Sequence, residues 1–238
     1  MKKKLAYIIG GEPRLIQHSF DESTVYKDLC KEYNVDVYIH CWTQEFKWTA
    51  YNNHYRWRRN KGYFPPGETY VKVSNEDIIE QYKIYEPKEC VIEDYDEKFT
   101  IGDFPFGQYI SRAKAYKNAV EQDKYDFVWL TRSDAIGVGP LHRMLRNKIY
   151  CPEAIFEDSR QLFRAEDWYY AGSTNMFENL IPFANDPLTA ITNLYENKWL
   201  KENMDKIRNT HIWQALLTGG DGANVFQGDD ITWKLPHY

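Results

Sequence analysis

Short apolar runs alternate with stretches of helical periodicity along the first part of the chain. Residues 5–9 form a five-residue apolar run that ends in two glycines, a pattern typical of a strand buried on both faces. Residues 14–33 carry apolar side chains at helical spacing, and residues 35–42 return to a strand pattern. A strand, a helix and a strand joined by short connections predict a right-handed parallel crossover.

The same alternation continues to the end of the chain. The strongest strand pattern is the apolar run at 125–131, which passes directly into charged residues. We expect further helices at 75–83, 107–123, 140–147, 174–180, 187–204 and 210–217, and further strands at 90–92, 149–150, 154–156 and 168–172. This order predicts one α/β domain over residues 1–238, with an open, mostly parallel sheet flanked by helices.

Residues 43–75 interrupt the alternation, because no period is sustained there. We interpret this segment as a long excursion, and long loops in compact domains are commonly functional or disordered. It contains the mixed cationic and aromatic cluster Arg56, Trp57, Arg58 and Arg59. That cluster could close over a nucleotide, contact an anionic membrane surface at the periphery, stack on single-stranded nucleic acid, or simply be a solvated loop.

Composition narrows the class of protein. A net charge of −5 argues against nucleic acid as the partner of the whole surface, and 8 Trp with 19 Tyr favour carbohydrate over a purely structural role. The apolar run after the initial lysines is too short for a signal peptide, and no stretch approaches the ~18 apolar residues of a membrane span. Four scattered cysteines are typical of reduced thiols. We therefore expect a cytoplasmic enzyme.

Candidate chemistry begins where the first strand ends. In open α/β sheets, ligands bind beyond the carboxyl ends of strands at the point where the strand order reverses. Gly10 and Gly11 allow the backbone to approach a ligand closely, and Arg14 can offer a fork of donors to phosphate. The segment matches neither the dinucleotide fingerprint nor the phosphate-binding P-loop. The alternative is a tight turn with a surface arginine.

A second candidate follows the strand at 125–131. Arg132 and Asp134 come directly after this apolar run, which places a carboxylate at the carboxyl edge of the sheet. Hard divalent cations such as Mg²⁺ or Mn²⁺ bind carboxylates together with substrate phosphates. The alternative is a charged turn that ends the strand.

With these residues the chain resembles the GT-A-type nucleotide-sugar glycosyltransferases, in particular the small bacterial and viral enzymes of surface-polysaccharide synthesis. The resemblance rests on residues 5–14, 35–42, 125–134 and 167–173. It implies a Rossmann-related fold and transfer of a sugar from a nucleotide-diphosphate donor to a glycan, glycolipid or other hydroxyl acceptor. The family carries Asp-x-Asp after the central strand, binding ribose and metal. Here Arg132 occupies the first acidic position, so only Asp134 carries over.

The resemblance also implies roles for other residues. It implies Mn²⁺ or Mg²⁺ at Asp134, with Arg132 able to take over part of the cation's work on the diphosphate. It makes Asp167 the preferred base for the acceptor hydroxyl. Glu166 is the other candidate for the base, and His237 could complete the metal site. Candidates for either the base or the metal are Asp221, Asp229 and Asp230. Gln108 and Arg112 could reach the donor from the helix at 107–123 or belong to a solvated face.

Two other functions stay open at this point. One is a sugar-phosphate nucleotidyltransferase, although such enzymes have a longer glycine-rich loop with a lysine that is missing here. The other is a non-catalytic carbohydrate-binding protein that uses the aromatic surface.

Overall fold

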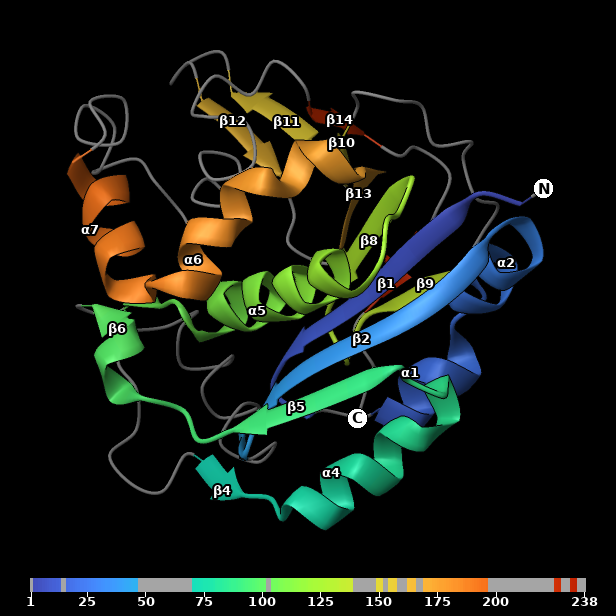
Figure 1. Ribbon diagram of the computed structural model, residues 1–238, viewed down its shortest axis with the longest axis horizontal. Helices are drawn as coiled ribbons and strands as arrows, with labels where there is room; N and C mark the ends of the chain where they lie inside the picture. The colour runs from blue at the N-terminus through green and yellow to red at the C-terminus, as the bar shows by residue number, and fades with distance from the viewer. Residues whose placement is uncertain are drawn as a thin grey trace.

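A seven-stranded sheet organises the computed structural model of the chain (Figure 1). The structure describes residues 2–13, 16–46, 70–101, 104–138, 149–151, 154–157, 162–165, 169–196, 225–227 and 232–234. The strands of this sheet, in spatial order, are β14 (Val225–Gln227), β10 (Ile149–Cys151), β13 (Tyr169–Ser173), β8 (Phe127–Thr131), β1 (Lys4–Gly11), β2 (Asn34–Trp42) and β5 (Glu89–Glu93).

The sheet is mostly parallel. Strands β8, β1, β2 and β5 form an unbroken parallel set, and β10 and β14 are parallel to each other. Strand β13 is antiparallel to both of its neighbours, β8 and β10. The sequence-based prediction of an open, mostly parallel α/β sheet is therefore confirmed, with one antiparallel strand that the apolar pattern did not distinguish.

Helices cover both faces of the sheet. The helices are α1 (Ile16–Glu22), α2 (Val25–Glu32), α4 (Asn75–Tyr82), α5 (Gly107–Gln122), α6 (Ile181–Asn185) and α7 (Pro187–Glu196), with 3₁₀ turns η1 (Lys83–Tyr85), η2 (Glu97–Phe99) and η3 (Thr174–Leu180). Helix α5 lies across β1 and β2 on one face together with α6 and η3, whereas α1, α2 and α4 pack on the other (Figure 1).

Alternation along each strand divides the core into two layers. In β1, Leu5, Tyr7 and Ile9 face the α1, α2 and α4 side, while Ala6 and Ile8 face α5. All five side chains are less than a tenth exposed. Since successive strand residues point to opposite faces, a continuous apolar run is what a strand covered on both sides requires.

Short paired strands lie outside the main sheet. They are β3 (Gln44–Phe46) with β4 (Tyr70–Lys72), β6 (Thr100–Ile101) with β7 (Phe104–Pro105), β9 (Ile136–Val138) with β15 (Thr232–Lys234), and β11 (Ala154–Glu157) with β12 (Leu162–Ala165), all antiparallel. The excursion expected at 43–75 thus begins and ends in a strand pair that holds its two ends together.

The single helix expected over residues 14–33 is wrong, since the described part contains two helices, α1 and α2. The break falls at Ser23 and Thr24, which both bind the carbonyl of Gly137 in β9: Ser23 through Oγ at 3.0 Å and Thr24 through its backbone amide at 3.0 Å. The Thr24 amide thereby leaves the helical hydrogen-bond series, whereas the Ser23 amide still donates to the Ser19 carbonyl at 3.0 Å. The helices expected at 140–147 and 210–217, and the end of that at 187–204, lie outside the described residues.

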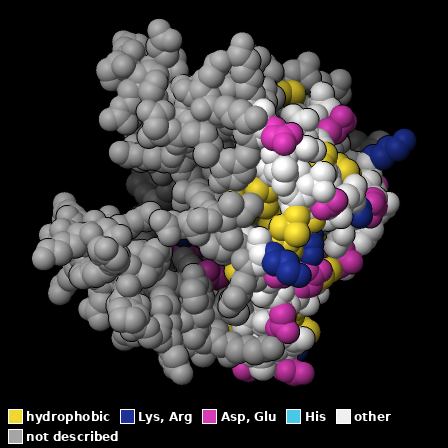
Figure 2. Space-filling model, turned by 90° about the vertical axis from the view of Figure 1, so that its left-hand side faces the viewer, with side chains coloured by type: hydrophobic (Ala, Val, Ile, Leu, Met, Phe, Trp, Pro, Cys, Tyr) yellow, Lys and Arg dark blue, Asp and Glu magenta, His cyan; other side chains and the backbone are white. Residues whose placement is uncertain are grey.

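Figure 2 shows charges of both signs on one face of the described part of the chain. Acidic side chains are scattered over this face, and the basic ones lie mainly near its centre and at one edge. Among the described residues, no helix combines the length and the apolarity needed to cross a membrane.

Candidate functional site

The strand order reverses between β1 and β8. From β1 the chain proceeds to β2 and then β5 on one side, whereas β8 pairs with the opposite edge of β1. Ligands of open α/β sheets bind beyond the carboxyl ends of the strands at such a switch point. We call the ends of β8, β1, β2 and β5 the carboxyl rim. Both sequence-based candidates, the one after β1 and the one after β8, lie on it.

The two candidates are in direct contact. Ile9 pairs with Thr131 in the β1–β8 register, so β8 ends beside Ile9 and β1 continues for two more residues to Gly11. Ser133 then donates a hydrogen bond from Oγ to the carbonyl of Glu12 at 2.6 Å. We call Gly10, Gly11 and Glu12 the diglycine bend. The structure therefore brings the bend and the Arg132–Asp134 turn together at the switch point.

Gly10 is a glycine because helix α5 approaches its backbone closely. A Cβ at this position would lie 2.5 Å from Cγ, 2.7 Å from N and 2.8 Å from Cα of Arg112. Two of these atoms belong to the helix backbone, which cannot move aside without shifting the whole helix. Arg112 itself is fully buried, so its long side chain is part of the packing under the bend.

Gly11 is required for its backbone conformation. Its φ of +122° is one that side-chain-bearing residues rarely adopt, whereas space is not the constraint, since a Cβ there would make an ordinary contact with Cβ of Gln108 at 3.9 Å. Its amide donates to Oγ of Ser111 on α5 at 2.7 Å. This amide therefore points into the protein, and the approach of a ligand to the bend would use other groups.

Arg132 and Asp134 form a two-bond ion pair. Nε of Arg132 donates to Oδ1 of Asp134 and Nη2 donates to Oδ2, both at 2.8 Å. The aspartate side chain is 8% exposed and that of the arginine 22%. Paired donors of this kind fix a guanidinium plane, because they match the geometry of a carboxylate. Asp134 thus holds Arg132 in place, with the guanidinium partly open to solvent at the rim.

This pairing bears on the expected metal. Both oxygens of Asp134 accept from Arg132, so a divalent cation at this carboxylate would share those oxygens with the guanidinium. No group of three or more His, Cys, Asp or Glu in the described ranges is arranged to hold a metal ion. Of the two expected metal ligands the structure describes Asp134, and His237 lies outside the described residues.

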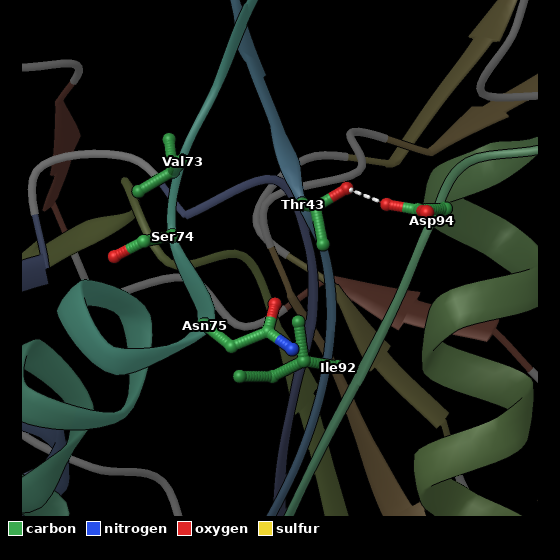
Figure 3. A pocket seen from close by; sticks show the side chains of 6 residues that line it. All are labelled: Thr43, Val73, Ser74, Asn75, Ile92 and Asp94. Carbon is green, nitrogen blue, oxygen red and sulfur yellow. Dashed lines mark hydrogen bonds between the residues drawn. The ribbon is translucent and has the colours of Figure 1, made fainter.

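An open cavity adjoins the same rim two strands further along. It measures about 550 Å³ and is lined by Thr43, Val73, Ser74, Asn75, Ile92 and Asp94 (Figure 3). Thr43 follows β2 and Asp94 follows β5, and the threonine Oγ1 donates to Oδ1 of Asp94 at 2.5 Å. Ser74 and Asn75 begin helix α4 on the opposite wall. Four of its six lining residues have polar side chains, which can exchange hydrogen bonds with the hydroxyl groups of a ligand.

Several residues singled out in the sequence lie outside the described part of the chain. They are Arg14, the cluster at 56–59, Glu166, Asp167, Asp221, Asp229, Asp230 and His237. Of the sequence-based site residues, the structure places Gly10, Gly11, Gln108, Arg112, Arg132 and Asp134, and it brings all six to one end of the sheet.

Residues that sequence reasoning did not assign to the site also meet here. His40 in β2 is paired with Gly10 in register, is 1% exposed, and contacts Ser111 of α5 at 3.0 Å through Nδ1. Glu93 ends β5, where its carboxylate is hydrogen-bonded by Lys114 of α5. The sequence does contain a signal for both residues, because each is a polar residue near the carboxyl end of an apolar strand: His40 in the run 35–42 and Glu93 after the run 90–92.

Comparisons with known proteins give a limited result. No protein-family model and no curated protein sequence matches the chain. Among solved structures, it is similar to the glycosyltransferase GlyE of Streptococcus pneumoniae TIGR4 at 12% identity, with a TM-score of 0.35, and to the apo form of the same enzyme at 12% identity, with a TM-score of 0.37. Each match covers 95% of this chain but 45% of the solved one.

Proposed function

We propose that the protein is a glycosyltransferase that moves a sugar from a nucleotide-diphosphate donor to a hydroxyl acceptor. The observation that carries the proposal is the junction of the diglycine bend with the Arg132–Asp134 turn at the switch point of the sheet. This is where open α/β sheets bind nucleotides. The sequence resemblance of the segments that form the junction supports the same conclusion.

Arg132 is the group proposed to bind the diphosphate. Glycosyl transfer leaves negative charge on the departing nucleoside diphosphate, and fixed cationic donors stabilise that charge most strongly when they are already oriented. Asp134 orients the guanidinium through two hydrogen bonds. A metal is not assigned a step here, because both oxygens of Asp134 accept hydrogen bonds from Arg132.

The cavity between β2, β5 and α4 is proposed to receive the nucleoside. Adjacent parallel strands are about 4.8 Å apart, so β5 lies about 10 Å from β1, a span that ribose and base can cover. Thr43 and Asp94 present oxygen atoms suited to hydroxyl and N–H groups. The acceptor and the base that activates it, for which Asp167 is the candidate, belong to the part of the proposal that rests on the resemblance.

Ligand-induced stabilisation tests the proposal. A panel of UDP-, GDP- and dTDP-sugars, with and without Mn²⁺, is followed by thermal unfolding and by donor hydrolysis. We expect one nucleotide class to raise the melting temperature, and Arg132→Ala to reduce affinity at least about tenfold, or 1.4 kcal/mol. Asp134→Ala is expected to abolish activity.

Lys31→Ala is the matched control, because it removes one positive charge from an exposed position on α2, where the side chain is 73% exposed. It is expected to leave nucleotide affinity unchanged. If no donor changes the melting temperature and none is hydrolysed, the assignment as a glycosyltransferase is wrong. Binding of glycans without nucleotides would instead indicate a carbohydrate-binding protein, and pyrophosphate release from NTP and a sugar-1-phosphate would indicate a nucleotidyltransferase.

A further inference from the structure

A hydrogen-bonded network lies under the diglycine bend and joins four elements. Its members are Gly11 of β1, His40 of β2, Glu93 of β5, and Ser111 and Lys114 of α5; we call it the Ser111 network. Ser111 and His40 are almost fully buried, whereas Glu93 is about two-fifths exposed. The network therefore connects the backbone of the bend with solvent.

Counting hydrogens on Ser111 determines the tautomer of His40. The hydroxyl accepts from the Gly11 amide at 2.7 Å and donates to the His40 carbonyl at 2.5 Å. A hydroxyl has a single hydrogen, so none is left for its third contact, with Nδ1 of His40 at 3.0 Å. Nδ1 must therefore carry the hydrogen of that bond, and the neutral ring has its lone pair on Nε2.

That lone pair is directed at another acceptor. Nε2 lies 3.5 Å from Oε2 of Glu93 and makes no hydrogen bond within the described ranges. The neighbouring His40 and the ammonium group of Lys114 lower the pKa of Glu93 to about 2, so the group is a carboxylate at neutral pH. A neutral His40 thus places two acceptors opposite each other, and a proton on Nε2 would join them.

Charged groups around His40 act in opposite directions. Burial is the largest influence and lowers its pKa, Glu93 of β5 raises it, and Lys114 of α5 lowers it again. Arg112 is the other cation of α5 beside the bend, and the register partner from β1 is Gly10, which has no charge. A negative charge bound at the rim would act in the same direction as Glu93 and raise the pKa of His40.

We propose that an anionic ligand at the diglycine bend draws one proton from solvent onto Nε2 of His40, so that ligand binding and proton uptake are coupled. The added proton forms an Nε2–H bond to Oε2 of Glu93, and no bond to the ligand is made or broken. His40 is then a positioning residue, because it acts through Ser111 on the Gly11 backbone. The choice of ligand rests on the function proposed above.

The coupling has a definite sign. If a ligand raises the pKa of His40, a proton is taken up on binding, and affinity rises as pH falls between the free and the bound pKa. One coupled proton changes the affinity by at most about tenfold per pH unit. UDP-glucose is a suitable probe, because each of its phosphates has one ester and one anhydride bond and so has no group that titrates in the range of histidine.

Calorimetry of UDP-glucose in two buffers of different ionisation enthalpy measures the uptake between about pH 5.5 and 8. We expect the wild type to take up a proton fraction that increases as pH falls, and His40→Asn to take up none. Asparagine keeps an N–H donor where Nδ1 was but cannot titrate. His18→Asn, at an exposed position of α1, is the control and should behave as wild type.

Nitrogen NMR of the imidazole rings gives a second measurement, which does not need a nucleotide. We expect the Nδ1–H tautomer for His40 in the free protein, and an Nε2–H tautomer would overturn the inference. UDP-glucose binding without proton uptake would also overturn it, while the proposed function stood. If no nucleotide sugar binds, the proposed function fails, and the same calorimetry with sulfate decides. Sulfate binding with uptake supports the inference, whereas no binding or no uptake overturns it.

Discussion

Gly10 has no room for one additional carbon atom. Alanine would place its Cβ 2.5–2.8 Å from three atoms of Arg112, two of them in the backbone of α5. We expect Gly10→Ala to lower the free energy of unfolding by about 2–3 kcal/mol, as overpacking does in well-filled interiors. Urea unfolding measures this, with Asn193→Ala on the exposed side of α7 as a control of no expected loss. An unchanged midpoint for Gly10→Ala would contradict the tight packing.

Glu93 makes stability depend on pH in the acidic range. Its pKa falls from the usual 4.5 to about 2, because the folded state favours the carboxylate through His40 and Lys114. A lowered carboxyl pKa contributes stability above the unfolded value, and that contribution is lost as pH falls towards the folded value. We therefore expect wild type to lose stability between about pH 4.5 and 2, and Glu93→Gln to lose less over the same interval.

Unfolding curves at a series of pH values compare the two proteins. Glu76→Gln is the matched control, because Glu76 is an exposed acid in the first turn of α4. It should follow the wild-type curve. Parallel pH profiles for wild type and Glu93→Gln would show that the network does not hold Glu93 in its charged form.

At the level of residues, the sequence predicted the positions of the site but not the contacts within it. Gly10 and Asp134 could be placed on one edge because parallel strands end together, and strand ends are visible in an apolar pattern. The contact of His40 with Ser111 spans 71 positions and leaves no local signature. The Arg132–Asp134 ion pair could not be predicted either, although its members are two residues apart, because side chains of neighbouring residues in a turn can point in different directions.

Among the elements, the stability of helix α4 depends on its N-cap residue, Ser74. Ser74 accepts a hydrogen bond from the amide of Asp77 at 3.1 Å and donates to its carboxylate at 2.7 Å. We expect Ser74→Ala to lower the free energy of unfolding by about 1 kcal/mol, the usual loss when a helix cap is removed. Ser74→Asn is the control, since asparagine caps as well as serine. Equal stability of all three proteins would mean that the cap is unimportant.

Helices and strands were predicted well where the local apolar pattern defines them, and less well where a contact with a distant part of the chain ends them. The helix at 107–123 and the strand at 90–92 correspond to α5 and β5, because both have a local pattern sufficient to define them. The helix expected over 14–33 divides at Ser23 because β9 supplies a hydrogen-bond partner from residue 137. No periodicity in residues 14–33 contains information about that partner.

For the molecule as a whole, the class of fold followed from the alternation of strands and helices, whereas the direction of β13 did not. Tyr169 and Tyr170 face opposite layers of the core, so β13 is buried on both faces like the parallel strands of the sheet. The direction of a strand depends on the side from which the chain re-enters the sheet, and this is decided by the connecting segments, whose sequences show no regular apolar pattern.

Metal removal tests whether Arg132 or a bound cation neutralises the diphosphate of the ligand. Since Arg132 occupies both oxygens of Asp134, we expect EDTA to weaken UDP-glucose binding by less than about tenfold, or 1.4 kcal/mol. Arg132→Ala should weaken it more than that in the same buffer. Calorimetry with and without EDTA makes the comparison. A larger loss on chelation than on substitution would mean that a cation, bound through residues beyond those described, carries the diphosphate.

The two halves of the carboxyl rim give the last prediction, because they are proposed to bind different parts of one ligand. If the nucleoside occupies the cavity and the diphosphate the diglycine bend, Asp94→Ala should reduce affinity for UDP about tenfold and leave affinity for pyrophosphate unchanged. Arg132→Ala should reduce both. Asp94→Asn keeps an acceptor for Thr43 and separates loss of charge from loss of the Thr43 bond. Equal effects of Asp94→Ala on the affinities for UDP and pyrophosphate would contradict the proposal, because Asp94 would then not contact the nucleoside alone.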